Sequence, residues 1–156
     1  MIVSDAGPLI ILLQTKQLSI LKELFGVVNV PIAVYNEITV KEQEKAAFSK
    51  AEWLKPVKVK KDNDYNLLEE LVDRGEAEAI ILAKQLKLTL LADDAKARKY
   101  AMLLNVDVIG TLGLLKLAKS RSVIPSVKAV IKEMLAEGYY IDGRLIAKLL
   151  EDTGES

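Results

Sequence analysis

The stretch "TLLADDAKARKYAMLL" (residues 89–104) decides the fold class of this chain. It begins with a short apolar run typical of a buried strand, reaches two consecutive aspartates, and continues with the spacing of an amphipathic helix. A strand followed directly by a helix is the building unit of a parallel α/β sheet. Asp93 and Asp94 therefore lie where the strand ends, at the edge where open parallel sheets bind ligands.

The same alternation of strand and helix patterns runs along the rest of the chain. The predicted strands are 2–3, 27–30, 89–93 and 106–110, with a short edge strand at 57–60. The predicted helices begin at Pro8 and cover 18–25, 31–50, 64–88 (in two parts separated at Gly75), 94–104, 111–121 and a closing section of about 125–151. This order predicts one domain, residues 1–156, folded as a three-layer α/β sandwich with a mostly parallel central sheet of about five strands.

Composition limits the chemistry that this chain can perform. It has 22 basic and 22 acidic residues, no cysteine and no histidine. These absences exclude disulfides, thiolate metal sites and a histidine general base, and the carboxylates that remain favour hard cations such as Mg²⁺ or Mn²⁺. No apolar run reaches the roughly 18–20 residues of a membrane span, and the N-terminus has the pattern of a strand rather than a signal peptide. We therefore expect a cytoplasmic protein that does not associate with membranes.

Aspartates follow two of the predicted strands. Asp5 follows the first strand, and Asp93 and Asp94 end the strand at 89–93. Two strands therefore deliver acids to the same edge of the sheet. An aspartate before a helix is also a common N-cap, so Asp5 or Asp94 alone is explained by capping.

Two glutamates add to this group. On a helical wheel Glu76 lies within the apolar face of its helix, whereas Glu78 lies on the opposite face and is expected to point to water. Glu37 lies at the margin of the apolar stripe of the helix that begins at Pro31. Glu76 also suits a helix dipole, and Glu37 also suits a solvated rim. Together, however, converging acids repel one another unless a cation neutralises them, which favours a divalent metal.

Four segments, taken in order, resemble the PIN-domain family of metal-dependent ribonucleases. They are "VSDAGPLI" (3–10), "VPIAVYNEI" (30–38), "GEAEAIILAKQLKLTLLADDAKARKYA" (75–101) and "VIGTLGLL" (108–115). Within the family, the chain looks most similar to a prokaryotic branch related to the VapC-type toxins. The tail at 124–150 also resembles the ending of that branch.

The resemblance implies a PIN-like fold and hydrolysis of RNA phosphodiester bonds. It implies an acidic quartet of Asp5, Glu37, Glu76 and Asp94 that holds Mg²⁺ or Mn²⁺, with Asp93 as the second choice for the last position. It further implies RNA as the substrate, and a toxin role with a small antitoxin protein as partner. Because PIN-like proteins commonly dimerise and the closing helices are rich in apolar residues, we also expect a homodimer, with residues 126–140 as the main contributor.

Contacts to RNA would come from local charge rather than from a global field. Lys96 and Arg98 directly follow Asp94 and are candidate backbone contacts, although basic runs are more often solvated faces. Thr111 follows a predicted strand at the same edge and is a candidate for orienting water or phosphate, with a helix N-cap as the alternative.

A non-catalytic nucleic-acid-binding or partner-binding module is the alternative function. Relatives in the PIN family often carry Ser or Asn where this chain has Gly7, and Thr where it has Ala92. Both differences remove polar groups near the acids and favour the alternative, whereas the intact quartet opposes it. A receiver-like phosphotransferase is disfavoured because no lysine follows the strand at 106–110.

Overall fold

Five parallel strands form the central sheet in this computed structural model of residues 1–156. The strand order is β3-β2-β1-β4-β5, so the first strand lies in the middle, and Val3 pairs with Asn29 on one side and Leu90 on the other. This all-parallel sheet confirms the predicted α/β fold class. The strands are β1 (Ile2–Ser4), β2 (Val28–Pro31), β3 (Leu54–Val57), β4 (Leu90–Leu91) and β5 (Val108–Ile109).

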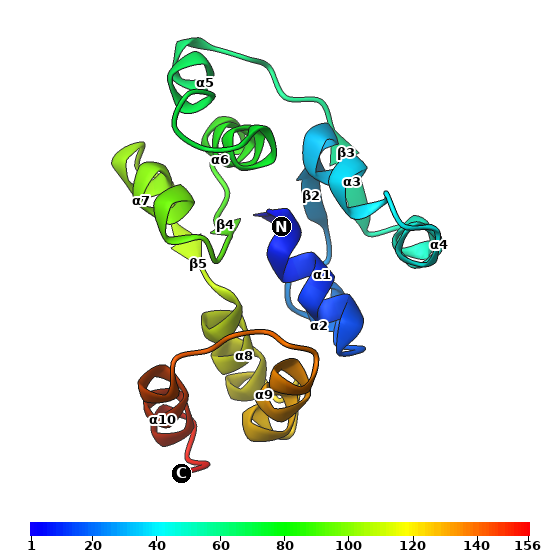
Figure 1. Cartoon of the computed structure of the whole chain (residues 1–156), viewed down its shortest axis with the longest axis vertical. Helices are drawn as coiled ribbons and strands as arrows, with labels where there is room; N and C mark the ends of the chain where they lie inside the picture. The colour runs from blue at the N-terminus through cyan, green and yellow to red at the C-terminus, as the bar shows by residue number, and fades with distance from the viewer.

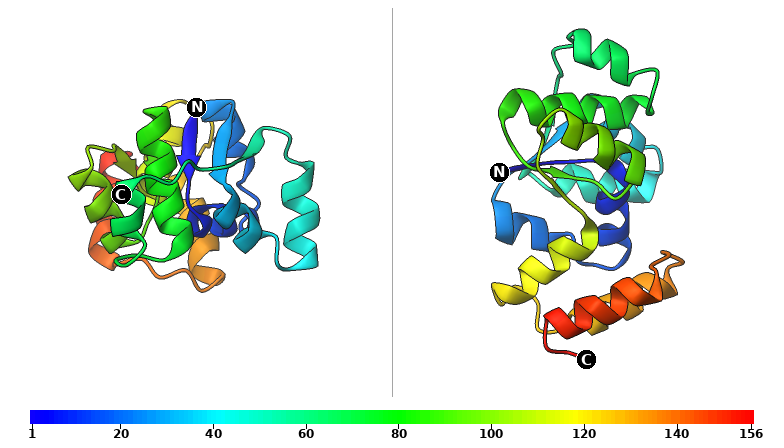
Figure 2. Two further views of the ribbon diagram at one scale, coloured as in Figure 1. Left: turned by 90° about the horizontal axis from the view of Figure 1, so that it is seen from above. Right: turned by 90° about the vertical axis from the view of Figure 1, so that its left-hand side faces the viewer.

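Helices cover both faces of the sheet. Figure 1 and Figure 2 show α5 and α6 on one side and α8, α9 and α10 on the other, with the C-terminus beside α10. None of the helices is long and apolar enough to cross a lipid bilayer. The helices are α1 (Ala6–Gln14), α2 (Ser19–Phe25), α3 (Ile32–Ile38), α4 (Glu42–Lys50), α5 (Asn63–Leu68), α6 (Arg74–Leu86), α7 (Ala95–Leu103), α8 (Thr111–Ser120), α9 (Val127–Ala136) and α10 (Gly143–Asp152).

One continuous apolar core holds these layers together. It contains 39 buried apolar residues, and Ile2 and Val3 of β1 are completely buried. A central parallel strand is covered on both faces, which explains why its sequence is apolar without alternation. The core thus fixes β1, and with it the position of the acid that follows.

The predicted helix at 31–50 is wrong, because the structure has two helices there. α3 ends near Thr39, whose hydroxyl donates a hydrogen bond to the Tyr35 carbonyl at 2.7 Å. α4 then starts in a new direction that buries Phe48. The turn between them stops α3 one residue after Glu37 and keeps that side chain at the end of the helix.

The predicted edge strand at 57–60 is also misplaced, since β3 covers Leu54–Val57 and pairs in parallel with β2. The prediction rested on the alternation of "VKVK" (57–60), whereas the observed edge strand includes Pro56, which an edge strand tolerates. The break between α5 and α6 falls at residues 69–73 rather than at Gly75, which is buried in the first turn of α6.

Candidate active site

The topology creates a crevice between β1 and β4. The chain leaves β1 toward β2 and β3 and returns through β4 on the other side, so the strand order reverses at this point. Open α/β sheets bind ligands in such a crevice, beyond the carboxyl ends of the strands. The Asp5 backbone N–H donates to the Leu91 carbonyl at 2.9 Å, which holds the ends of β1 and β4 together beneath the crevice.

Six carboxylates surround a small pocket of about 180 Å³ in this crevice. No lysine or arginine lines the pocket, and none of the six carboxylates forms an ion pair. The structure thus brings together all five acids predicted from the sequence and adds one that was missed. The six carboxylates are Asp5, Glu37, Asp73, Glu76, Asp93 and Asp94.

Asp5 is the most buried of these acids, with 8% of its surface exposed. It is also the N-cap of α1, and its Oδ1 accepts a hydrogen bond from the Ala6 N–H at 2.8 Å. This cap starts the helix at Ala6, two residues before the predicted start. Burial, reinforced by the charges of Asp73, Glu37 and Asp94, raises the pKa of Asp5 to about 6. Asp5 therefore combines the capping role with a place in the pocket.

Glu76 and Asp73 form a capping box at the start of α6. The Asp73 carboxylate accepts the Glu76 N–H at 2.8 Å, and the Glu76 carboxylate accepts the Asp73 N–H at 3.1 Å. Burial and the nearby charges of Asp73, Asp94 and Asp5 raise the pKa of Glu76 to about 7 despite that hydrogen bond. Sequence reasoning missed Asp73, although the D-x-x-E spacing of "DRGE" (73–76) is a recognised capping signal.

Glu37 reaches the pocket from α3. Burial and the Asp73 carboxylate raise its pKa above the usual range. A Cβ atom on Gly75 would lie 3.0 Å from Glu37 Oε1 and 3.4 Å from Val34 Cγ2. Glycine at this position therefore lets α3 and α6 pack closely enough for their acids to share one pocket.

The two adjacent aspartates after β4 have different surroundings. Asp94 caps α7 by accepting the Ala97 N–H at 2.9 Å, and it remains exposed. Asp93 instead accepts the backbone N–H of Thr111 at 2.7 Å, the Thr111 hydroxyl at 2.5 Å and the Tyr139 hydroxyl at 2.8 Å. Asp93 thus ties α8 and the segment before α10 to the end of β4, whereas one oxygen of Asp94 accepts no hydrogen bond.

The expectation that Glu78 points to water is wrong. Glu78 is 4% exposed, and its carboxylate accepts the Ala33 N–H at 3.2 Å and the Arg74 Nε–H at 3.2 Å. Glu78 therefore connects α6 to the first turn of α3, at a position outside the carboxylate pocket. The helical-wheel prediction was wrong because it assumed a single buried face. α6 packs against more than one neighbour, and every residue from Ala77 to Ala83 is buried.

The three candidate RNA-contact residues differ in their exposure to solvent. Lys96 is exposed in the first turn of α7, and Arg98 is half-buried and forms no ion pair. Thr111 is completely buried and bound to Asp93. Thr111 is also not the N-cap of α8, because Gly110 occupies that position.

The donor set of the pocket suits a hard divalent cation. Carboxylate oxygens are the ligands that Mg²⁺ and Mn²⁺ prefer, and unpaired acids raise one another's pKa in the absence of a counter-ion. The acids are spread around the wall, however, and no group of three or more is placed to hold a metal ion directly. Mg²⁺ usually keeps several water molecules and needs only one or two direct carboxylates, so the pocket fits such an ion.

Comparison with known proteins places the whole chain in one family. The family model DUF3368, described as a PIN domain, matches residues 1–155 and so includes every carboxylate of the pocket. PIN domains are generally nucleases. A search of curated proteins found no match to the sequence. With almost its full length matched, the chain belongs to the PIN-domain family.

Proposed function

We propose that this protein is a divalent-metal-dependent ribonuclease. Asp5, Glu37, Glu76 and Asp94 would hold Mg²⁺ or Mn²⁺, with Asp93 as the alternative to Asp94. The observation that carries the proposal is the set of six carboxylates around one small pocket that contains no basic side chain.

The energetics of the pocket support a bound cation. Asp5 and Glu76 have pKa values raised to about 6 and about 7, so the metal-free pocket disfavours the ionised acids. A divalent cation held by these acids would supply a water molecule of lowered pKa and would stabilise negative charge on a phosphate. The acids would then be ionised as ligands, and no side-chain nucleophile is required.

The hydrogen bonds of the chain support distinct roles for its acids. The Ala6 N–H fixes one oxygen of Asp5 and leaves the other without a hydrogen bond, and Ala97 does the same for Asp94. Asp93 already accepts three hydrogen bonds from Thr111 and Tyr139. This difference favours Asp94 as the ligand and Asp93 as the residue that positions the strand end.

Substitution of Asp5 tests the proposal. Asparagine caps a helix as well as aspartate, so Asp5→Asn should fold normally while it removes one charged ligand. Because changes to residues that only support a ligand already cost about 10–100-fold, we expect the rate of Mn²⁺-dependent RNA cleavage to fall by more than about 100-fold. Asp107→Asn, an exposed acid at the opposite end of β5, is the matched control and should cleave like the wild type. Full cleavage by Asp5→Asn would contradict a ligand role for Asp5.

A non-catalytic binding module is the second candidate function. The spread of the carboxylates, with no three placed to hold an ion directly, favours it. Ala92, which is completely buried and places no polar side chain beside Asp93, also favours it. A wild type that binds RNA but does not cut it with Mg²⁺ or Mn²⁺ would establish this alternative.

The proposed partners follow from the proposed activity. RNA is the substrate, and a small antitoxin protein would be the partner if the chain acts as a toxin in the cytoplasm. Co-purification of the chain with the product of an adjacent gene would test the antitoxin, and a chain that purifies alone in full activity would argue for a stand-alone nuclease.

A further inference from the structure

A second, larger cleft adjoins the carboxylate pocket. It has a volume of about 780 Å³ and lies between α7, the start of α8 and the segment that joins α9 to α10. Asp93 lines both cavities, so the cleft lies directly beside the candidate active site. Its wall is mainly apolar, and the large aliphatic side chains on it are Met102, Val108, Ile109, Leu112, Ile141 and Leu145.

The free charge in this cleft is positive. Arg98 and Lys99 line it, and neither forms an ion pair. The Arg98 guanidinium packs so tightly against Gly110 that a Cβ atom there would collide with it. It also donates a long hydrogen bond of 3.5 Å to the Ala92 carbonyl, so it is held at the end of β4 next to Asp93.

Both acids of the cleft accept hydrogen bonds, but only one of them is paired with a cation. Asp93 accepts its three hydrogen bonds from Thr111 and Tyr139, and Asp142 forms an ion pair with Arg144 at 3.4 Å. The donors to Asp93 are neutral, so Asp93 keeps its negative charge. The unpaired charges of the cleft are therefore two cations and one carboxylate, a net charge of +1.

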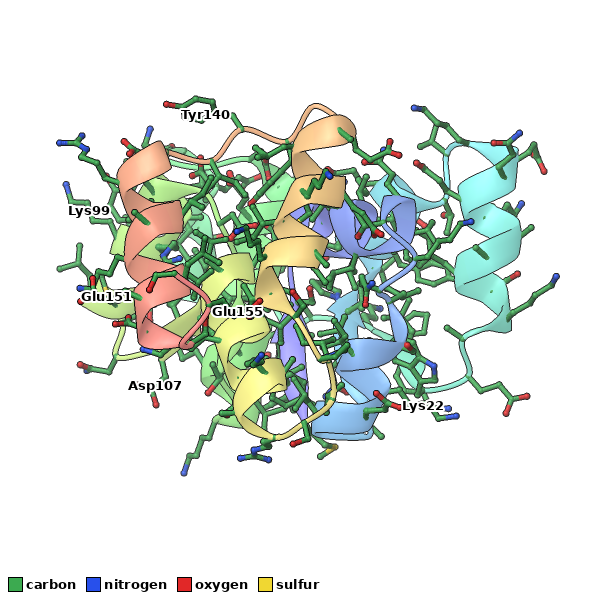
Figure 3. All side chains as sticks on the ribbon, turned by 90° about the horizontal axis from the view of Figure 1, so that it is seen from below. Lys22, Lys99, Asp107, Tyr140, Glu151 and Glu155 are labelled. Atoms are coloured by element: carbon green, nitrogen blue, oxygen red, sulfur yellow. The ribbon has the colours of Figure 1, made fainter.

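Two tyrosines give the cleft an aromatic rim. The Tyr139 ring is fixed by its hydrogen bond to Asp93, whereas Tyr140 is 85% exposed. Figure 3 shows the Tyr140 side chain projecting beyond the ribbon, with Lys99 on the same side of the molecule and Lys22 on the opposite side. An exposed tyrosine ring next to basic side chains is the arrangement that binds single-stranded nucleic acid, by stacking on a base while the cations bind phosphate.

We propose that this cleft binds one nucleotide of single-stranded RNA next to the phosphate that enters the carboxylate pocket. Tyr140 stacks on the base, and Arg98 and Lys99 bind the adjoining phosphate. The inference rests on the proposed function, because it takes the carboxylate pocket as the place where the chain is cut. The positive free charge and the shared residue Asp93 favour RNA over an apolar peptide or a second copy of the chain as the occupant.

Binding of a fluorescein-labelled single-stranded RNA to the full chain, measured by anisotropy in EDTA, tests the cleft without cleavage. Tyr140→Ala should raise the Kd about tenfold, and Tyr140→Phe, which keeps the ring, should bind like the wild type. Lys99→Gln should weaken binding and reduce the dependence of log Kd on log salt by about 0.7. Lys22→Gln, an exposed cation on the far side, is the matched control and should change neither quantity.

The outcomes separate this inference from the nuclease proposal. An inactive wild type that binds RNA through Tyr140 would contradict the nuclease and support the cleft. A wild type that cuts RNA but has the same Kd after Tyr140→Ala would support the nuclease and overturn the cleft. A change in molecular mass on Tyr140→Ala or Lys99→Gln, measured by light scattering, would show an interface between copies and would also overturn it.

Discussion

The helix cap formed by Asp5 leaves room for the ligand role proposed for the same side chain. Its Oδ1 accepts the Ala6 N–H, while no hydrogen bond reaches its other oxygen. Asp94 has the same arrangement, with one oxygen bound to the Ala97 N–H. A carboxylate has two oxygens and about four acceptor positions, so one cap leaves enough capacity for a cation. The caps fix the direction of both side chains before any metal binds.

The raised pKa of Asp5 predicts how the metal-free protein responds to pH. The folded-state pKa of about 6 lies above its ordinary value of 3.8, so folding is penalised when Asp5 is ionised and is favoured as the pH falls through 6. Asp5 should add roughly 1 kcal/mol to the free energy of unfolding between pH 7 and pH 5, and roughly 3 kcal/mol once it is protonated in both states. Urea unfolding in EDTA should show that Asp5→Asn is the more stable protein at pH 7 and gains less than the wild type on acidification. An equal gain in both proteins would contradict the raised pKa.

Sequence reasoning found the acids that follow strands and two of the acids on helices, Glu37 and Glu76, but it misplaced Glu78 and missed Asp73. Asp5, Asp93 and Asp94 were predictable because the carboxyl ends of parallel strands meet at one edge. Glu78 was misplaced because a helical wheel assumes one buried face, and Asp73 was missed because it was not recognised as a helix cap. Tyr139 lies 46 residues from Asp93, and only the tertiary structure brings them together.

At the scale of whole elements, the strand–helix alternation was predictable, and the breaks within helices were not. α3 and α4 separate so that Phe48 can be buried, and Gly75 lies inside α6 because α3 approaches closely there. Both features depend on packing between helices, which local sequence patterns do not contain. The start of α9 is held by a residue that is distant in the sequence. Contacts of this kind cannot be predicted from local sequence patterns for the same reason.

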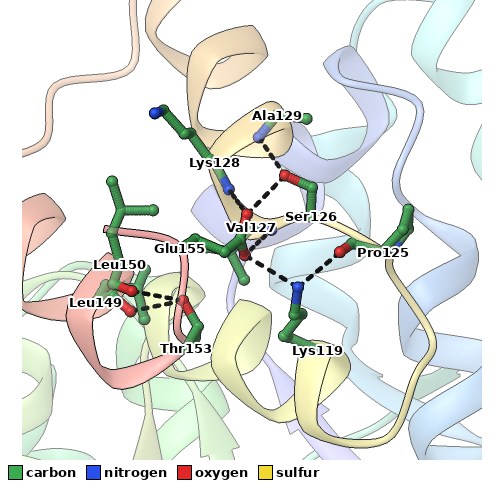
Figure 4. Close-up of polar contacts among 10 residues, drawn as sticks. All are labelled: Lys119, Pro125, Ser126, Val127, Lys128, Ala129, Leu149, Leu150, Thr153 and Glu155. Carbon is green, nitrogen blue, oxygen red and sulfur yellow. Dashed lines mark hydrogen bonds and ion pairs between the residues drawn. The ribbon is translucent and has the colours of Figure 1, made fainter.

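Figure 4 shows that the start of α9 is held by Glu155 near the C-terminus. The Glu155 carboxylate accepts hydrogen bonds from the Ser126 hydroxyl and the Val127 N–H, each at 2.7 Å. It also accepts the Lys128 N–H at 3.2 Å and pairs with Lys119 at 3.5 Å. The hydrogen bond from Ser126, with those from the two backbone N–H groups and the charge of Lys119, lowers the pKa of Glu155 to about 2.

Glu155→Gln should therefore lower the Tm at pH 7 by a few degrees, because it removes the charge that three hydrogen-bond donors and a lysine share. A depressed pKa stabilises the folded state above the unfolded value of 4.5, and this contribution is lost as the pH falls toward 2. Thermal melts should thus show a difference between wild type and variant at pH 7 that shrinks steadily below pH 4.5. Glu151→Gln, an exposed acid that forms no ion pair, is the control. The same loss in both variants would argue against a specific role for Glu155.

At the scale of the whole molecule, a balanced net charge conceals strong local separation. The chain carries 22 basic and 22 acidic residues, yet six of the acids share a pocket without a single cation. The adjoining cleft has two unpaired cations, Arg98 and Lys99, beside the shared carboxylate of Asp93. A polyanion is therefore not attracted by the overall field, and its association depends on short-range contacts beside an acidic pocket. A divalent cation would reduce the negative charge of that pocket and so lower the repulsion of a phosphate that approaches it from the basic cleft.

The quaternary structure stays a prediction at this same scale. The expected homodimer rested on the apolar residues of 126–140, but Val130, Ile131 and Met134 of α9 are buried within the chain itself. Leu135, 45% exposed, is the one large aliphatic side chain that α9 leaves for a partner. We therefore expect the dimer contact to be centred on Leu135.

Light scattering at micromolar concentration should give about twice the chain mass of 17.2 kDa for the wild type. Leu135→Arg should shift the protein to the monomer, because a charged side chain cannot be buried across an interface without a partner. Leu67→Arg makes the same change on α5, at the opposite end of the molecule in Figure 1 and Figure 2, on a leucine that is 66% exposed. That control should remain a dimer.

A monomeric wild type would contradict the expected homodimer, and a dimer unaffected by Leu135→Arg would show that the contact does not involve Leu135. Since Leu135 does not line the carboxylate pocket or the basic cleft, a monomeric variant that still binds RNA would show that each chain carries a complete site.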